Sequence, residues 1–405
     1  MRKIVALTLI LVLLTGCEGL RGNSRSYRMQ KETEYLAEIS QPITLGNASE
    51  TTDVLEKQVR SQNVVLTGVV PGVSGNAELQ RYFFEAFNGV REIDYLIAEV
   101  PYSAGAFINQ YLRETGEQSL ERAFAGLEGK PYATEENRSF YRQLKLYLKE
   151  NNQSVRVIGI DLEYAPEMAL EYLSVVLSRY PTDTFPLAGE LIEAQKKGFT
   201  QEDYLELSFM GLLNEFRQEN ELARSVYSRD YDVVIGILEN LEMTYEEKDK
   251  GPNDLFDRDR SDQIVKNFLS IYDKAPNAMY FGQLANPAVM QSTHINYDWF
   301  ASAIQKERES LKNKVISMLY TYEDCQRMVL LSGRAEKVKL DLFKFDNKSM
   351  LNSIDQPYTL ISLIEKNSLF TDETIIFEKD FNGAVTDYFQ YLVVLNESPA
   401  SKTLN

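Results

Sequence analysis

Two acidic side chains and one histidine are the residues of this chain whose types could support acid–base chemistry. Glu99 follows the apolar run Tyr95–Ala98. Asp161 follows a second predicted strand, Val155–Ile160, in which apolar residues alternate with Arg156. Ligands of open α/β sheets bind at the carboxyl ends of the strands, so carboxylates that follow two strands are candidates for one site. His294 is the only histidine in the 405 residues, and it is therefore the only candidate for a histidine general base.

The same side chains have structural alternatives. A carboxylate at a strand end often caps the next helix or pairs with an arginine. A histidine in a loop commonly bonds its neighbours, and we favour this interpretation for His294. A single histidine excludes a multi-histidine zinc site, so we expect neither a metal nor a cofactor. Cys325 has no second thiol near it in the sequence, which favours a small core residue.

A unit of strand, turn, helix and strand positions the first carboxylate. Val64–Leu66 predicts the first strand, and Glu99 ends the second. Between them lie a turn rich in glycine and proline, over residues 68–75, and a helix with an aromatic face formed by Tyr82, Phe83, Phe84 and Phe87. The glycines lack the spacing of a phosphate-binding loop, so we interpret them as a turn.

Strands alternate with helices along the rest of the chain, which predicts an α/β fold with a mostly parallel sheet flanked by helices. Later strands are expected over residues 278–281, 315–320, 337–345, 374–377 and 389–395. Residues 166–243 are helical in pattern, and we interpret about 166–262 as a helical insertion or subdomain over the sheet. The charged stretch 245–262 is typical of a solvated loop. We expect one domain over 31–400.

The amino terminus has the pattern of an export signal. Arg2 and Lys3 precede Ile4–Leu14, an apolar segment too short to span a bilayer as a helix. It ends in Leu14–Cys17 (LTGC), which resembles the lipobox of bacterial lipoproteins. The resemblance implies a signal peptide over 1–16, lipidation of Cys17 and a membrane tether over 17–30. The protein would then be exported to the bacterial cell envelope and anchored there by lipid.

Charge and cysteine content narrow the class of partner. The net charge of −17 argues against nucleic acid and against electrostatic docking on anionic lipid. Contact with the membrane would come from acyl chains on Cys17. Lipidation of Cys17 would leave Cys325 alone, so no intrachain disulfide would form. The fold would then be held by its core.

Several short segments occur in an order typical of one known superfamily. They are Ile97–Val100, Phe107–Leu112, Gly159–Asp161, the helix with Arg260 and Asn267–Phe268, Tyr280–Gln283, Val315–Tyr320 and Asp387–Leu395. In this order they resemble the erythromycin esterase-like group, which is related in fold to the haem-binding ChaN-like lipoproteins. The resemblance covers most of residues 60–400. It implies a site that contains Glu99 and Asp161, with Arg260 beside them on a late helix.

The chain departs from that group at the catalytic positions. The family pattern has Gly-Glu and a histidine after the first strand, and a second histidine after a late strand. Histidine and acids there activate water for attack on an ester. The corresponding segments here are Gly68–Gly72 (GVVPG) and Leu284–Ala288 (LANPA), which contain no acid and no histidine. Their side chains cannot hold and release a proton near neutral pH.

Three hypotheses follow. The first is a catalytically degenerate lipoprotein that binds a small-molecule or protein ligand through Glu99, Asp161 and Arg260. The second is a hydrolase that uses His294 as base, oriented by Glu99 or Asp161. The third comes from fold analogy alone and is haem binding, with His294 or a tyrosine as axial ligand. We favour the first and do not expect an enzyme.

Overall fold

The computed structural model describes residues 30, 34–47, 49–198, 201–248, 254–293, 296–329, 334–337, 354, 356–365, 368–371 and 383–404. The predicted signal peptide, Cys17 and His294 lie outside the described residues. The strand predicted over 374–377 and nearly all of the one over 337–345 lie outside them too.

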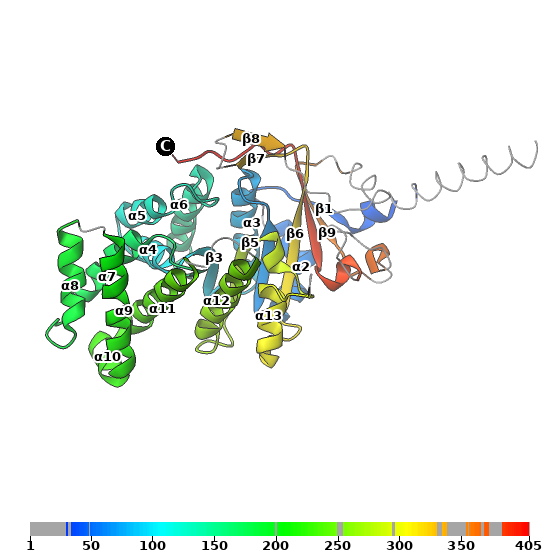
Figure 1. Cartoon of the computed structure of the whole chain (residues 1–405). Helices are drawn as coiled ribbons and strands as arrows, with labels where there is room; N and C mark the ends of the chain where they lie inside the picture. The colour runs from blue at the N-terminus through cyan, green and yellow to red at the C-terminus, as the bar shows by residue number, and fades with distance from the viewer. Residues whose placement is uncertain are drawn as a thin grey trace, which may run out of the picture.

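An eight-stranded sheet forms the centre of the fold (Figure 1). Its strands are β1 (Ser40–Pro42), β2 (Val64–Val69), β3 (Tyr95–Pro101), β4 (Arg156–Asp161), β5 (Tyr280–Ala285), β6 (Val315–Glu323), β9 (Tyr358–Ser362) and β10 (Tyr391–Asn396). They lie in the order β1-β9-β10-β6-β2-β5-β3-β4. Neighbours from β10 to β4 are parallel, and β9 is antiparallel to β1 and β10. The predicted α/β fold with a mostly parallel sheet is confirmed.

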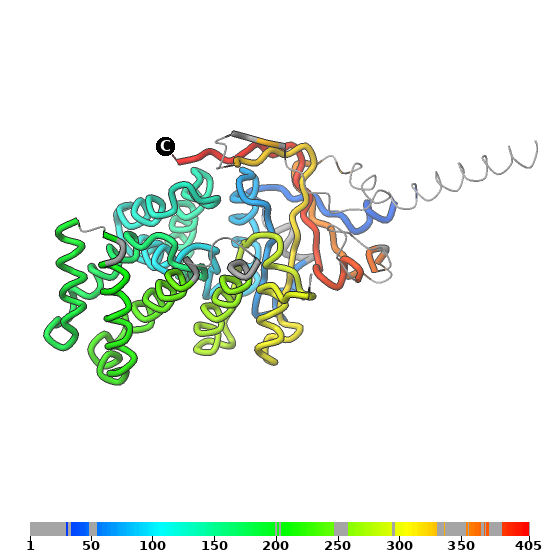
Figure 2. Tube along the Cα trace, viewed as in Figure 1, coloured from blue at the N-terminus to red at the C-terminus, as the bar shows by residue number. Residues whose placement is uncertain are grey.

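Helices connect and cover these strands. Those in the first half are α2 (Ser49–Ser61), α3 (Gly75–Val90), α4 (Tyr102–Arg113), α5 (Gln118–Gly126), α6 (Glu135–Glu150), α7 (Pro166–Leu177) and α8 (Pro186–Lys196). Those that follow are α9 (Glu202–Gln218), α10 (Asn220–Tyr227), α11 (Tyr231–Lys248), α12 (Asp254–Tyr272) and α13 (Phe300–Glu307). The trace in Figure 2 shows α7 to α10, in green, gathered beyond the β4 edge of the sheet. A separate hairpin consists of β7 (Gln326–Val329) and β8 (Arg334–Lys337).

Aromatic side chains fill both faces of the sheet around β5. Phe281 contacts Phe87 of α3, with ring centroids 5.5 Å apart. Tyr280 contacts Phe268 of α12 at 5.3 Å. Consecutive strand residues point to opposite faces, so α3 covers one face and α12 covers the other. The aromatic face predicted for α3 therefore packs on the sheet, as expected.

Helix α4 protects the edge of the sheet at β4. The Asn109 side chain accepts a hydrogen bond from the main-chain N–H of Val157 and donates to its main-chain oxygen, at 2.8 and 2.6 Å. It thereby replaces the missing neighbour strand. Gly105 faces the main chain of Gly159, where an added Cβ would meet the Gly159 nitrogen. The close approach of α4 thus requires glycine at residue 105.

Some predicted boundaries were wrong, for identifiable reasons. β3 runs past Glu99 to Pro101. β5 continues through Gly282, because this glycine lets β5 pack against Ile97 and does not end the strand. The loop predicted to extend to Asp262 is already helix α12 from Asp254. A highly charged segment can still be helical when the apolar residues that pack the helix against the fold come later in the sequence. In α12 these residues include the buried Phe268.

Candidate functional site

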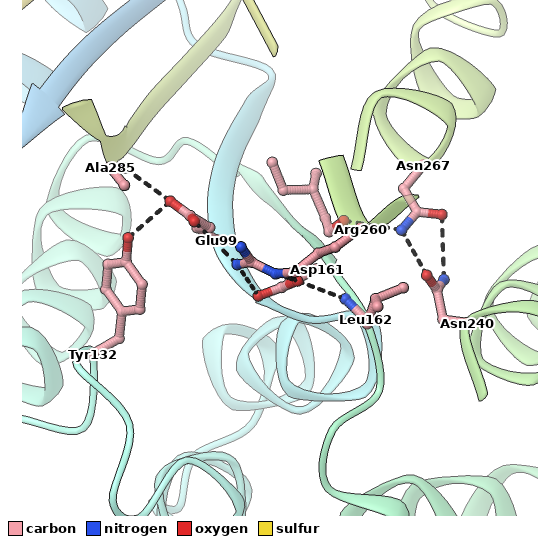
Figure 3. Close-up of polar contacts among 9 residues, drawn as sticks. Glu99, Tyr132, Asp161, Leu162, Asn240, Arg260, Asn267 and Ala285 are labelled. Carbon is pink, nitrogen blue, oxygen red and sulfur yellow. Dashed lines mark hydrogen bonds and ion pairs between the residues drawn. The ribbon is translucent and has the colours of Figure 1, made fainter. Parts of the chain in front are cut away.

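The two predicted carboxylates meet at the guanidinium of Arg260 (Figure 3). Arg260 Nε donates to Asp161 Oδ1 at 2.8 Å, and Nη2 donates to Asp161 Oδ2 at 2.7 Å. Nη2 also donates to Glu99 Oε1 at 3.2 Å. The bond to Asp161 is bidentate, the stronger geometry for an arginine–carboxylate pair. Glu99 and Arg260 therefore form an ion pair, and we name Glu99, Asp161 and Arg260 the arginine cluster.

Three elements position the arginine cluster. Asp161 is the last residue of β4, and Glu99 lies near the end of the neighbouring strand β3. The register between these strands shifts between Ala98 and Pro101, so Glu99 lies in an irregular stretch. Such irregularities commonly redirect a side chain next to a functional site. Arg260 reaches both acids from α12.

Asn267 fixes α12 against β4. It lies about two turns after Arg260, on the same side of the helix. Its Nδ2 donates to the main-chain oxygen of Ile160 at 2.9 Å and to Asn240 Oδ1 at 2.7 Å. Both asparagines are buried. A buried amide with satisfied bonds selects one packing arrangement, so Asn267 helps to set where Arg260 meets the strands.

Glu99 has further partners that the sequence did not reveal. Its Oε2 accepts the Tyr132 hydroxyl at 2.9 Å and the main-chain N–H of Ala285, at the end of β5, at 2.8 Å. Glu99 thus joins β3, β5 and the segment before α6. Tyr132 is distant in sequence and follows no strand, so periodicity offered no signal for it.

The arginine cluster carries one net negative charge and is only partly open to solvent. The side chains of Asp161 and Glu99 are 3% and 10% exposed, whereas that of Arg260 is 30% exposed. Burial alone would lower the pKa of Arg260, but the charges and hydrogen bonds of Asp161 and Glu99 raise it. Burial, with the charge of Glu99 and its hydrogen bond, raises the pKa of Tyr132 well above its ordinary value. Arg260 is therefore a permanent cation and Tyr132 a neutral donor.

A second buried carboxyl lies two residues beyond Asp161. Glu163 accepts the main-chain N–H and the hydroxyl of Ser103, both at 2.6 Å. Both residues are fully buried. Burial raises the pKa of Glu163 to about 8, although the bonds from Ser103 lower it, and the charge of Asp161 raises it further. Ser103 lies in the first turn of α4, where free N–H groups favour a carboxylate. Glu163 therefore anchors the start of α4.

The strand ends beside the arginine cluster carry apolar groups. Val69, at the end of β2, and Val289, after β5, are buried. Gly68 lies directly against Val289, and an added Cβ would overlap its Cγ2. Apolar packing therefore occupies this edge of the sheet next to the arginine cluster.

The segment just before His294 bonds elsewhere on the sheet. Gln291 Nε2 donates to the main-chain oxygen of Val315, the first residue of β6, at 2.9 Å. β6 and β3 are separated by β2 and β5, which corresponds to about 14 Å at the usual strand spacing. Thr293 bonds Asp298 at 2.7 Å. His294 itself lies outside the described residues, so its proposed role as base stays a prediction.

Two further observations concern other classes of site. Within the described residues, no group of three or more histidine, cysteine or acidic side chains is placed to hold a metal ion. In the same residues, no helix combines the length and apolarity needed to cross a membrane. Cys325 is buried and accepts the Ser398 N–H at 3.3 Å, which confirms the predicted core position.

Comparison with known proteins identifies the fold. No protein-family model and no curated protein matches the sequence. Among solved structures, the erythromycin esterase EreC, as a His-to-Asn mutant in its open conformation, is 14% identical with a TM-score of 0.62. The match covers 90% of this chain and 97% of that one. The chain has an erythromycin esterase-like fold.

Two other structures share this esterase-like fold. A Bacillus cereus protein is 14% identical with a TM-score of 0.68, over 93% of this chain and 99% of that one. A succinoglycan biosynthesis protein is 13% identical with a TM-score of 0.68, over 92% and 98% of the two chains. The likeness extends over almost the whole chain in each case, so the resemblance in fold is confirmed. Identity this low concerns the fold alone.

Proposed function

We propose that this protein is an exported, lipid-anchored protein whose esterase-like fold binds a polar ligand and does not hydrolyse esters. The LTGC sequence that ends at Cys17 supports the anchor. The arginine cluster supports the binding site. The proposal assigns the ligand to the carboxyl ends of β3 and β4, where open α/β sheets bind theirs.

The binding proposal rests on the hydrogen bonds that the Arg260 guanidinium makes and on the donor that it leaves free. Asp161 and Glu99 hold its Nε and Nη2 groups, whereas Nη1 has no hydrogen-bond partner among the described residues. The side chain is 30% exposed. A rigid cation with free N–H donors at a strand end can donate charge-assisted hydrogen bonds to a ligand oxygen.

The charge of the arginine cluster indicates the ligand class. Two carboxylates and one guanidinium leave a net negative charge, which repels an anion. Hydroxyl or carbonyl oxygens on an uncharged ligand avoid this repulsion and still accept from Arg260. The polar ligand is therefore a neutral compound rich in hydroxyl or carbonyl groups.

Loss of hydrolysis is supported by the groups around the arginine cluster. Both acids are already bonded to Arg260, and Glu99 also accepts from Tyr132 and Ala285. Val69 and Val289 occupy the neighbouring strand ends. The alternative is a hydrolase whose base is His294, with Glu99 or Asp161 as its orienting acid.

Ester hydrolysis by the full-length protein in detergent separates these two functions. Wild type and His294→Ala are compared on aryl esters and macrolides. We expect no hydrolysis by either above the rate with heat-denatured protein. Hydrolysis by wild type that is lost in His294→Ala, with an unchanged circular dichroism spectrum, would establish the hydrolase instead.

Binding is tested by thermal shift with a panel of neutral sugars, polyols and macrolides. A ligand that raises the Tm of wild type should not raise the Tm of Arg260→Lys. Lysine keeps the positive charge but lacks the planar set of N–H donors of a guanidinium. Arg60→Lys, at an exposed helix pair with Glu56, is the matched control and should respond like wild type. A ligand that shifts Arg260→Lys as much as wild type would place binding outside the arginine cluster.

The lipid anchor has its own test. Cys17→Ser should move the protein from the membrane fraction to the soluble fraction of a bacterial host and abolish incorporation of labelled palmitate. Cys325→Ser keeps Cys17 and should remain in the membrane fraction. Membrane retention of Cys17→Ser with no lipid label in wild type would contradict lipidation.

A further inference from the structure

A separate hollow lies between the sheet and helices α11 and α12. Tyr95, at the start of β3, and Arg156, at the start of β4, line it, together with Tyr102 from the first turn of α4. Its volume is about 260 Å³. Ligand pockets for drug-sized molecules measure about 300–1,000 Å³, so an occupant here would be smaller. Asn267, which anchors α12 to β4, also lines this hollow.

The hollow is cationic in an acidic protein. Five basic side chains line it, and they are Arg156, Arg217, Arg224, Lys266 and Lys274. Two acids, Asp232 and Glu239, accompany them. The whole chain carries −17. A local excess of positive charge against such a background concentrates anions. We name this site the cationic hollow.

Two of the cations are unpaired. Arg217 is held by Glu242 at 2.6 Å, and Lys274 by Asp232 at 2.7 Å. Neither Arg156 nor Lys266 makes a side-chain hydrogen bond or ion pair with any residue in the described part of the chain. Arg156 and Lys266 come from β4 and α12, on different elements around one hollow. They are therefore available to an anion between them.

The hydroxyl of Tyr102 is a further donor in the lining of the hollow. The Tyr102 side chain is buried, with 8% exposure, and its hydroxyl has no hydrogen-bond partner among the described residues. Gly236 of α11 makes room for the ring, because an added Cβ would lie 2.9 Å from Tyr102 Cζ. Burial raises the pKa of Tyr102 to about 12, so the phenol keeps its proton. Tyr102 lines the hollow, so a ligand oxygen there can accept a hydrogen bond from its hydroxyl.

Aromatic faces complete the lining. Tyr95 is stacked on Tyr280 with ring centroids 4.9 Å apart. Tyr231 packs under Arg224, whose guanidinium carbon is 4.4 Å from the ring centroid. These contacts hold both rings in place, so the hollow has rigid walls beside its cations.

We propose that the cationic hollow binds a small organic anion, of the size of a sugar phosphate or a sugar acid. Arg156 and Lys266 hold the anionic group, and the Tyr102 hydroxyl donates to a ligand oxygen. The site is distinct from the arginine cluster in both position and charge. Its ligand is an anion, whereas the arginine cluster takes a neutral compound.

Titration calorimetry on the full-length protein in detergent tests the proposal. The probes are glucose 6-phosphate, glucuronate and uncharged glucose. We expect saturable binding of at least one anionic probe, no binding of glucose, and weaker binding as salt rises. Arg156→Gln and Lys266→Gln should each lower the affinity for that probe by about tenfold or more.

Two variants make the test specific. Tyr102→Phe removes only the unpaired hydroxyl and should lower affinity about fivefold, a typical loss for one hydrogen bond. Lys312→Gln removes an exposed cation elsewhere and should bind like wild type. Absence of saturable binding by both anionic probes would overturn the proposal. Binding that survives unchanged in both Arg156→Gln and Lys266→Gln would overturn it as well.

Discussion

The arginine cluster and the cationic hollow use arginine in opposite ways. In the arginine cluster, Arg260 is held by two carboxylates that are nearly inaccessible to solvent. In the cationic hollow, Arg156 is exposed and has no ion-pair partner among the described residues. Arg260 is therefore needed to compensate buried charge, whereas Arg156 is free to interact with a ligand.

Burial therefore distinguishes an arginine that stabilises the fold from an arginine that is free to bind a ligand. Breaking a buried ion pair leaves an uncompensated charge, which costs far more than losing an exposed cation. One side chain can serve both roles. Arg260 does so if its free Nη1 group donates a hydrogen bond to a ligand. Stability measurements therefore separate the two regions before any ligand is known.

The largest expected effect comes from Arg260→Met. It leaves Asp161 and Glu99 without their cation, and we expect a loss of about 3 kcal/mol in the free energy of unfolding. Arg156→Met, in the cationic hollow, should change it by less than about 0.5 kcal/mol. Urea denaturation followed by circular dichroism measures both. Equal losses in the two variants would remove the distinction between the regions.

Glu163→Gln should change how stability depends on pH. The pKa of Glu163 is about 8 in the folded protein against an ordinary value of 4.5. The folded state thus binds this proton more tightly, and the free energy of unfolding falls as pH rises from 4.5 to 8. Glutamine cannot ionise, so the free energy of unfolding of Glu163→Gln should fall less over this pH range.

Urea midpoints at pH 5, 6.5 and 8 measure the effect. Glu309→Gln, at a residue that is 86% exposed, is the control and should keep the wild-type profile. The charge of Asp161 raises the pKa of Glu163, and the charge of Glu163 raises the pKa of Tyr102, so this carboxyl interacts with a residue of each region. A Glu163→Gln profile identical to wild type would mean that Glu163 is ionised throughout this range.

Tyr132→Phe should cost about 1 kcal/mol, the usual value of one hydrogen bond. It removes a donor to Glu99 and keeps the ring. Glu99 retains Arg260 and the Ala285 N–H, so its charge stays compensated. Urea denaturation detects the change, and a loss as large as that of Arg260→Met would show that Glu99 depends on the phenol more than on the guanidinium.

The smallest effect is expected for Tyr102→Phe without ligand. The lost hydroxyl has no partner among the described residues, so stability should change by less than about 0.5 kcal/mol or increase slightly. The same variant should lower affinity for an anionic probe. A clear destabilisation of the ligand-free protein would indicate that the hydroxyl is already bonded.

The positions of Glu99 and Asp161 were predictable because the signal is local. An apolar run followed by an acid marks a strand end, and parallel strands bring such ends to one edge. The aromatic face of α3 was predictable for the same reason. The charged stretch before Arg260 was misinterpreted as loop, since solvent exposure and helix formation are compatible and the apolar stripe of α12 begins only later.

The chain alone determined the central strands, the net negative charge and the carboxylates at the strand ends, because periodicity and residue type act over a few neighbouring positions. It did not reveal β1 and β9, the short strands on one side of the sheet. Only the tertiary structure decided which groups these carboxylates meet. Arg260 is 161 positions from Glu99, and Tyr132 is 33 positions from it. Such contacts depend on how α12 docks on β4 through Asn267. The cationic hollow also depends on tertiary contacts. Its basic residues come from several helices and one strand, and nothing in the sequence indicates that these elements line the same cavity.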